Sequence, residues 1–198
     1  DDLEKTILRV QDERDRTYGA AFILSPRLAL TCAHVVRLAG GQPGGRVRLA
    51  APSGEPLCHA RVDERSWDET LDAAILHLEE DAPDIKPLRL IPSAGCTGKR
   101  VRSLGFPGTG KSHTWAAGSI LGRVKDNNGR TLLQVDSKQM RAGFSGAPLW
   151  LEDSGGVIGM QVEALNPQRL DLPEDVAFAL SAEDIYQRLC EVLVESSL

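Results

Sequence analysis

Short apolar segments separated by turn residues fill the first half of the chain. A candidate strand at Thr6–Val10 is followed by five more, at Ala20–Leu24, Leu28–Thr31, Arg46–Ala50, Leu57–Val62 and Ala73–Leu78. Glycine and proline interrupt them at close intervals, most densely in the run 40–45. Short strands broken in this way are typical of an all-β sandwich or barrel.

The second half of the chain repeats the pattern after a connector that contains Pro83, Pro87 and Pro92. Its candidate strands are Val101–Leu104, Trp115–Ile120, Thr131–Val135, Leu149–Leu151, Gly156–Val162 and Val176–Leu180. Proline-rich segments of this kind separate structural units. We therefore expect one domain over 1–198, built from two similar halves at about 1–92 and 93–180.

One helix is predicted at the C-terminal end, at about 182–194. Ile185, Leu189 and Val192 recur there at helical spacing and form one apolar face. Ser181 and Asp184 have the S-x-x-D spacing of a helix cap. This helix is expected to pack on the β body.

Composition narrows the class of protein. The chain has 198 residues, of which 41% are apolar, and a net charge of −5, which excludes a disordered chain. No apolar run approaches the roughly 18 residues of a membrane-spanning helix. The acidic pI of about 5.4 argues against a nucleic-acid binder, which carries a basic face. We expect neither nucleic acid nor membrane as a partner.

The four cysteines indicate the compartment. Cys32, Cys58, Cys96 and Cys190 are irregularly spaced and form no C-x-x-C pair, so no metal site is predicted. A chain of this length needs no disulfides for stability. No signal-like segment follows Asp1. We expect a reducing, cytoplasmic setting, with neither a metal nor an organic cofactor.

Three segments carry candidate chemistry. The segment 28–36 places His34 just after a buried strand, the segment 71–76 places Asp72 before an apolar run, and Ser145 lies in a glycine-flanked turn at 143–149. A serine hydroxyl becomes a nucleophile when an imidazole takes its proton, and a carboxylate fixes the imidazole tautomer. A glycine at 143 allows the N–H groups of Gly143 and Ser145 to point at one developing oxyanion.

With these motifs the chain resembles the trypsin-like serine peptidases of the chymotrypsin fold, in particular the bacterial, disulfide-free branch with the HtrA-type proteases. The matching segments are Gly19–Leu24, Leu30–Val36, Asp72–Leu76, Gly105–Pro107, Gly118–Ile120, Gly143–Pro148, Val157–Met160 and Phe178–Leu180. The resemblance implies two packed antiparallel β-barrels followed by a C-terminal α-helix. It also implies a serine endopeptidase acting on protein or peptide substrates, with His34 as general base, Asp72 as its orienting acid and Ser145 as nucleophile.

Three departures from the family pattern matter. Ala147 stands where the second glycine after the serine is usual, a change of one methyl group. Phe144 stands where the digestive members have an aspartate, so no activation by N-terminal cleavage is expected. Val35 replaces the cysteine that follows the histidine in secreted relatives, so the resemblance implies that this disulfide is absent.

The resemblance also suggests where the substrate side chain binds. It implies a pocket with Gln139 at its base and walls from Met140–Ala142 and from Val162, Glu163 and Ala164. A neutral Gln139 argues against a preference for Lys or Arg. Two interpretations of Gln139 and Glu163 stand: Glu163 supplies a negative charge from the wall, or both are ordinary polar residues at the rim of a barrel.

Two alternative functions compete with a peptidase. The chain could be a non-catalytic peptide-binding relative, although no triad residue is lost. The segment Gly105–Ser112, with Lys111, satisfies the phosphate-loop pattern G-x-x-x-x-G-K-[ST]. That loop requires a following helix, whereas Gly118 and Gly122 favour a hairpin.

Compact domains of this type resemble peptidase modules joined to other domains in bacterial regulatory or defence systems. By this analogy we expect an intracellular bacterial module, with further domains of a longer chain or a co-encoded effector as partners.

Overall fold

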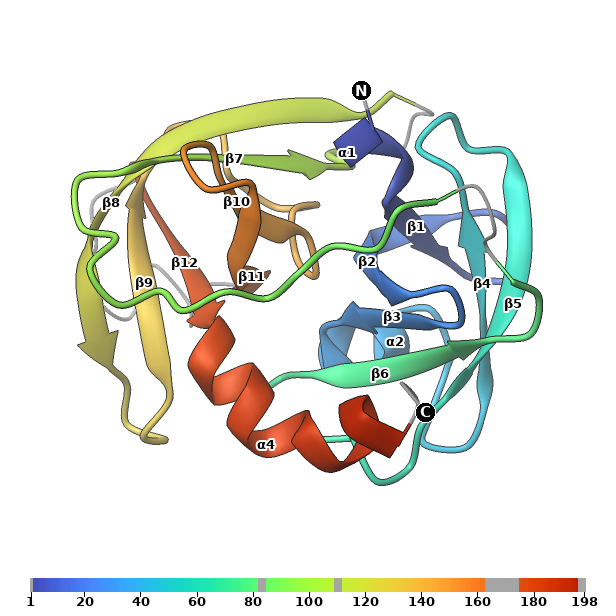
Figure 1. Ribbon diagram of the computed structural model, residues 1–198. Coiled ribbons are helices and arrows are strands. Elements are labelled where there is room, and N and C mark those ends of the chain that lie inside the picture. Colours follow the sequence, from blue (N-terminus) through green and yellow to red (C-terminus); the bar gives the residue numbers. More distant parts are fainter. Residues whose placement is uncertain (1, 82–84, 109–111, 163–174, 196–198) are drawn as a thin grey trace.

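Two closed antiparallel β-barrels lie side by side in the computed structural model, which describes residues 2–81, 85–108, 112–162 and 175–195 (Figure 1). The first barrel has the strand order β1-β2-β3-β6-β5-β4 and contains β1 (Ile7–Gln11), β2 (Thr17–Ser25), β3 (Leu28–Thr31), β4 (Arg46–Ala50), β5 (Pro56–Val62) and β6 (Ala74–Leu78). The second has the order β10-β11-β12-β9-β8-β7 and contains β7 (Arg100–Gly105), β8 (Thr114–Lys125), β9 (Thr131–Asp136), β10 (Pro148–Leu151), β11 (Gly156–Val162) and β12 (Val176–Ser181). The predicted all-β fold of two barrels is confirmed.

Three helices accompany the barrels in the described part of the chain: α1 (Asp2–Lys5), α2 (Ala33–Leu38) and α4 (Ala182–Glu195). The C-terminal helix α4 matches the sequence prediction. Its apolar face buries Ile185, Leu189 and Val192, and Ser181 Oγ accepts a hydrogen bond of 3.2 Å from the Asp184 N–H. Among the described residues, no helix combines the length and the apolar character needed to cross a membrane.

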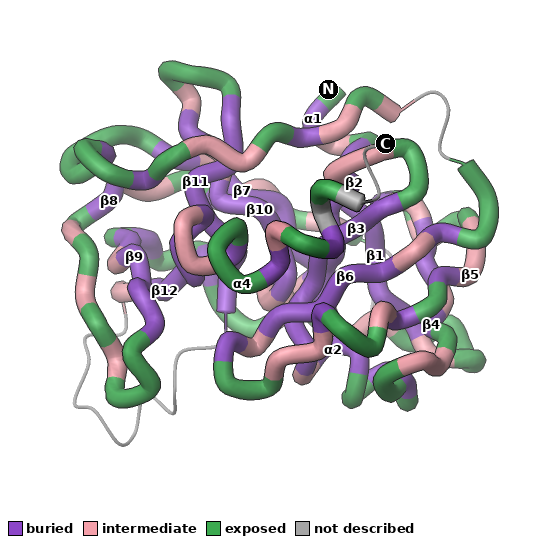
Figure 2. The backbone as a smooth tube through the Cα atoms, turned by 60° about the horizontal axis from the view of Figure 1, so that its bottom comes forward, coloured by how far each residue is buried: buried purple, intermediate pink, exposed green. Residues whose placement is uncertain are grey.

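The hydrophobic core extends from the first barrel across the interface to the second. One cluster joins the apolar strands of the first barrel to Met160 of β11, to Phe178 of β12 and to the apolar face of α4. A second, smaller cluster fills the second barrel. In Figure 2 the buried residues follow the strands and the exposed residues follow the hairpin turns. The first cluster therefore joins the two barrels and α4, whereas the second lies within the second barrel.

The connector between the barrels adds backbone hydrogen bonds to both of them. The Leu88 N–H donates to the Ile23 carbonyl of the first barrel at 2.9 Å, and the Ile91 N–H donates to the Val157 carbonyl of the second at 2.9 Å. Figure 1 shows this segment crossing from one barrel to the other. The division predicted near residue 92 falls within this connector.

The phosphate-loop interpretation of Gly105–Ser112 is wrong. Gly105 ends β7 and pairs in antiparallel register with Thr114, the first residue of β8. A strand therefore follows where a phosphate loop needs a helix N-terminus. Lys111 lies outside the described residues.

Candidate active site

Strand pairing in the first barrel brings His34 and Asp72 together. β3 and β6 are antiparallel, with Thr31 opposite Ala74. His34 lies three positions after Thr31, in α2, and Asp72 lies two positions before Ala74. Since neighbouring antiparallel strands place the end of one beside the start of the next, the two side chains meet at the same edge of the barrel.

Two hydrogen bonds join Asp72 to His34. Asp72 Oδ2 lies 2.7 Å from His34 Nδ1, and Asp72 Oδ1 accepts the His34 backbone N–H at 3.0 Å. An ionised carboxylate can only accept, so the proton of this hydrogen bond lies on Nδ1. The side chains are 15% and 17% exposed, enough for one ring edge to reach the surface. The two contacts from Asp72 therefore hold both the backbone and the ring of His34.

The loop that carries Ser145 is held by both barrels. The Ala20 N–H of β2 donates to the Ser145 carbonyl at 2.8 Å, and the Gly146 N–H donates to the Gln161 carbonyl of β11 at 2.8 Å. The close approach of β2 requires a glycine before Ala20, because a Cβ at Gly19 would lie 2.7 Å from the Ser145 carbonyl oxygen. The serine is thus fixed by backbone contacts with two different strands.

Hydrogen bonds also fix the orientation of the peptide groups around Gly143. The Gly143 carbonyl accepts the Phe106 N–H at 2.9 Å, and the Phe144 N–H donates to the Arg141 carbonyl at 3.1 Å. By contrast, the N–H groups of Gly143 and Ser145 donate to no group in the described part of the chain. Two backbone donors near a serine are what an oxyanion requires.

His34 and Ser145 line one cavity of about 410 Å³. Its other described lining residues are Tyr18, Leu38, Met140, Arg141, Ala142, Gly143, Phe144, Gln161, Val162, Val176, Ala177 and Phe178. Val162 and Met140–Ala142, which were expected in the walls of a substrate pocket, thus line this cavity. Glu163 and Ala164 lie outside the described residues.

Gln139, expected at the pocket base, lies outside this cavity. Its amide oxygen accepts the Ala117 N–H at 3.1 Å, and its side chain lines a separate surface hollow along β8. The cavity is instead bounded by Gln161, which is 3% exposed and whose Nε2 lies 3.0 Å from Met140 Sδ. Sequence reasoning missed Phe178, although its position opposite Val162 in the β11–β12 pair places it in the same wall.

The Phe144 side chain packs in the second apolar cluster, at the edge of the cavity that the residue also lines. Its side chain is 2% exposed, and its ring packs so closely on Gly105 that a Cβ there would lie 2.5 Å from it. The ring anchors the Ser145 loop through apolar packing. A buried aspartate at this position would need a cation as partner, whereas Phe144 is stabilised by apolar packing in the second barrel.

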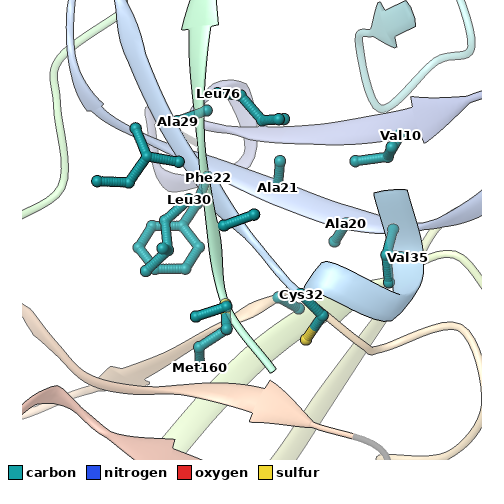
Figure 3. Close-up of a cluster of buried hydrophobic side chains, with 14 of the residues drawn as sticks. Val10, Ala20, Ala21, Phe22, Ala29, Leu30, Cys32, Val35, Leu76 and Met160 are labelled. Atoms are coloured by element: carbon teal, nitrogen blue, oxygen red, sulfur yellow. The ribbon is translucent and has the colours of Figure 1, made fainter. Parts of the chain in front are cut away.

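Cys32 lies beside the His34–Asp72 pair. Its Sγ, a ring nitrogen of His34 and an oxygen of Asp72 lie within 4.8 Å of one another, close enough to suggest a metal site. However, burial, together with the nearby Asp72 charge, raises the pKa of the thiol well above its usual range. The thiol donates to the Gln161 carbonyl at 3.3 Å, and Figure 3 shows it among apolar side chains. A buried neutral thiol is a poor metal ligand.

Comparison with known proteins agrees with this geometry. The model of the trypsin-like peptidase domain matches residues 19–160. The fold is similar to crystal structures of Rv3671c from Mycobacterium tuberculosis. An inactive serine-to-alanine mutant has a TM-score of 0.75 and 24% identity, over 97% of this chain and 88% of that one. The active form of that protease has a TM-score of 0.72 and 25% identity, over 95% and 81%.

A curated relative is the human peroxisomal leader peptide-processing protease, which is 28% identical over 144 residues, or 72% of this chain. The chain spans 25% of the length of that relative. The family match covers the β2 strand, both residues of the His34–Asp72 pair and the Ser145 loop. The chain therefore belongs to the trypsin-like peptidase family, and its two barrels have the chymotrypsin fold.

Proposed function

We propose that the chain is a serine endopeptidase that uses Ser145, His34 and Asp72. The observation that carries the proposal is the 2.7 Å contact between Asp72 and His34 Nδ1 beside a cavity that Ser145 also lines. It favours a catalytic domain over a non-catalytic peptide-binding relative, because a binding cleft does not need an oriented imidazole next to a serine.

In the proposed reaction, Ser145 Oγ attacks the substrate carbonyl and His34 Nε2 takes the hydroxyl proton. Asp72 stabilises the imidazolium that forms. The N–H groups of Gly143 and Ser145 bind the developing oxyanion, already oriented because the hydrogen bonds around them fix their loop. His34 then protonates the leaving amine, and water hydrolyses the acyl-enzyme by the same steps.

Labelling with a fluorophosphonate tests this proposal. Ser145 should be labelled in the wild type, and the labelling should be lost in Ser145→Ala and in His34→Ala. The matched control is His77→Ala, because His77 Nε2 also lies 2.8 Å from an aspartate, Asp63, yet it does not line the cavity. Peptide hydrolysis should fall by about 10⁴-fold or more in the two site variants. A folded wild type that is neither labelled nor active would contradict the proposal.

The cavity suggests a preference for neutral substrate side chains. Met140, Val162, Ala177 and Phe178 supply apolar surface, and the described lining residues include Arg141 but no Asp or Glu. An apolar wall next to a guanidinium disfavours a lysine or arginine, which needs a partner anion when buried.

A peptide library with varied residues before the cleaved bond tests the preference. We expect apolar residues to be cleaved at least about tenfold faster than Lys or Arg, the scale of a few buried methylene groups. The Glu163→Gln variant should leave this order unchanged. Fast cleavage after Lys or Arg that disappears in Glu163→Gln would instead assign Glu163 as a pocket acid.

The setting that we propose is a bacterial cytoplasm, where the domain acts on protein substrates as part of a regulatory or defence system. The match to only 25% of the curated relative supports the view that such a domain also occurs within longer proteins. Comparing cytoplasmic protein fragments produced by the wild type and by Ser145→Ala would identify substrates. Substrates confined to secreted proteins would contradict this setting.

A further inference from the structure

The backbone at Asp72 has an unusual shape. Its φ is +61°, in the left-handed region that residues other than glycine seldom adopt, although aspartate enters it more often than most. A residue held in this region costs free energy and persists only where its surroundings determine it. The geometry between Asp72 and His34 therefore depends on whatever holds the turn from 68 to 73.

Asp68 is the centre of this turn. Its backbone N–H donates to the Ala73 carbonyl at 3.1 Å, and the Ala73 N–H donates back to the Asp68 carbonyl at 3.0 Å. The Leu71 N–H donates to Asp68 Oδ1 at 2.8 Å. These bonds close the loop that contains Asp72, and Asp68 Oδ2 has a partner outside the turn.

That outside partner is Arg188 of the C-terminal helix. Arg188 Nε donates to Asp68 Oδ2 at 2.5 Å, and the Asp68 side chain is only 12% exposed. In Figure 1, α4 runs from the end of β12 past the segment that leads into β6. Although burial alone raises the pKa of Asp68, its hydrogen bonds with Leu71 and Arg188 hold the pKa below the usual value. The carboxylate thus remains charged while it connects the turn to α4.

A second contact comes from the β8–β9 hairpin of the other barrel. Arg130 Nη1 donates to the Leu71 carbonyl at 3.4 Å, next to Asp72. The guanidinium is held by Asp126, whose Oδ2 accepts Arg130 Nε at 2.6 Å, and the two side chains are 7% and 8% exposed.

The β1–β2 hairpin contains a matched turn that lacks this contact. Asp12 caps it as Asp126 caps the other, with Oδ1 accepting the Arg16 N–H at 3.0 Å and Oδ2 accepting Arg16 Nε at 2.8 Å. The Arg16 side chain is 62% exposed, however, and it contacts Asp12 and the Tyr18 ring. The two turns thus have the same aspartate–arginine contacts, but only Arg130 also contacts the 68–73 turn.

We propose that Arg130 and Arg188 are positioning residues, which hold the 68–73 turn, and with it Asp72, from the second barrel and the C-terminal helix. The inference rests on the proposed catalytic role of Asp72. It makes kcat depend in part on the docking of α4, since one of the two contacts comes from that helix. Neither arginine touches the substrate cavity.

The first test compares Arg130→Gln and Arg188→Gln with the control Arg16→Gln. We expect kcat to fall by about 100-fold in Arg130→Gln and about 10-fold in Arg188→Gln, the scale of a misplaced catalytic group, with KM within about twofold. Arg16→Gln should stay within about twofold of wild type in both constants. Thermal unfolding identifies any variant that fails to fold. Arg188 is 64% exposed, so its variant carries the test if the buried Arg130 variant unfolds.

The second test repeats the substitutions in an Asp72→Ala background. If both arginines act through Asp72, they should change the residual kcat by less than about twofold there, because residues that act as a unit are not additive. The inference would be overturned if the arginine variants lowered kcat by the same factor in both backgrounds. It would also be overturned if they lowered kcat no more than Arg16→Gln does.

A third readout does not require a reactive serine. The proton shared by His34 Nδ1 and Asp72 should give a downfield, slowly exchanging NMR signal, weakened in Arg130→Gln and Arg188→Gln and unchanged in Arg16→Gln. If the NMR signal changes in this way but the fluorophosphonate does not react with Ser145, the proposed function is contradicted and the inference is supported. If the fluorophosphonate labels Ser145 fully but no arginine variant changes the NMR signal, the proposed function is supported and the inference is contradicted.

Discussion

Two glycines of the Ser145 loop have no room for a side chain. Gly143 has φ +96°, and a Cβ there would lie 2.6 Å from the Phe106 carbonyl oxygen. Gly146 has φ +83°, and its Cβ would lie 2.0 Å from the Ala20 carbonyl oxygen. Both contacts are with backbone atoms that cannot rotate away. The loop therefore needs glycine for conformation and for space at the same positions.

The effect of space can be separated from that of conformation by comparing Gly146→Ala with Gly129→Ala. Gly129 has φ +78°, but nothing lies within 4 Å of its Cβ position. Its alanine variant should lose about 1 kcal/mol of unfolding free energy, the cost of the left-handed backbone alone. Gly146→Ala should lose about 3 kcal/mol or more, because a strand or the loop must also move.

Urea unfolding measures both losses, and fluorophosphonate labelling of the folded variants reports on the loop. Labelling should be retained in Gly129→Ala and lost in Gly146→Ala. Equal losses of stability in the two variants would show that the close contact with Ala20 can be relieved at no cost.

At the scale of elements, the sequence pattern predicted which segments form strands, but it did not always predict where each strand ends. Leu28–Thr31 and Gly156–Val162 have the same bounds in the structure as in the sequence prediction. β8 instead continues five residues beyond the predicted Ile120, through a register shift between Ile120 and Gly122. The apolar pattern ends at this bulge while the backbone pairing with β9 continues, so the pattern alone could not show the full strand.

The short helix α2 was missed for a local reason. It has six residues, and its N-cap residue Cys32 makes no side-chain cap hydrogen bond. Neither helical periodicity nor a capping motif is therefore present in 33–38. The helix is stabilised by tertiary packing, since Ala33, Val35 and Val36 are buried against the first barrel. The helix also contains His34, whose backbone N–H and Nδ1 both contact Asp72.

Site residues carried by local motifs were easier to predict than those set by strand register. His34, Asp72 and Ser145 each stand in a recognisable short segment, and the structure places all three around one region. The lining of the cavity depends on how β11 pairs with β12 and on which side chains of the segment after β9 turn inward. That distinction separates Met140, which lines the cavity, from its neighbour Gln139, which does not.

At the scale of the whole molecule, the candidate site exists only where the barrels meet. His34 and Asp72 come from the first barrel and Ser145 from the second, and β2 binds the Ser145 carbonyl directly. Buried Arg9 of β1 adds a contact across the interface, since its guanidinium lies 4.3 Å from the Phe106 ring centroid. Phe106 in turn donates to the Gly143 carbonyl. Residues more than a hundred positions apart thus shape one loop, which no local pattern could predict.

Acid-capped turns are spread over both barrels and should make the whole fold sensitive to acid. Burial alone would raise the pKa of Asp12, but hydrogen bonds from Arg16 and Arg14 outweigh it and lower the pKa to about 2. In Asp63, Asp68 and Asp126, hydrogen bonds likewise outweigh burial and lower the pKa. Each of these carboxyls has a higher pKa in the unfolded chain, near 3.9 on the usual scale, so the unfolded state binds more protons in acid.

The stabilisation from these four carboxylates is therefore complete above about pH 5 and is lost as the pH falls from about 4 towards 2. We expect the unfolding free energy from urea titrations to be nearly constant between about pH 7 and 5 on their account and to fall steeply below about pH 4.

Asp126→Asn should lower the stability at pH 6 and flatten the fall in acid, because asparagine has no carboxyl group to protonate. Since Asp126 also holds Arg130, Asp126→Asn should also lower kcat. Asp12→Asn should flatten the acid response in the same way but leave kcat unchanged. A stability that does not decline between pH 4 and 3, or an equal loss of kcat in both variants, would contradict this account of the two turns.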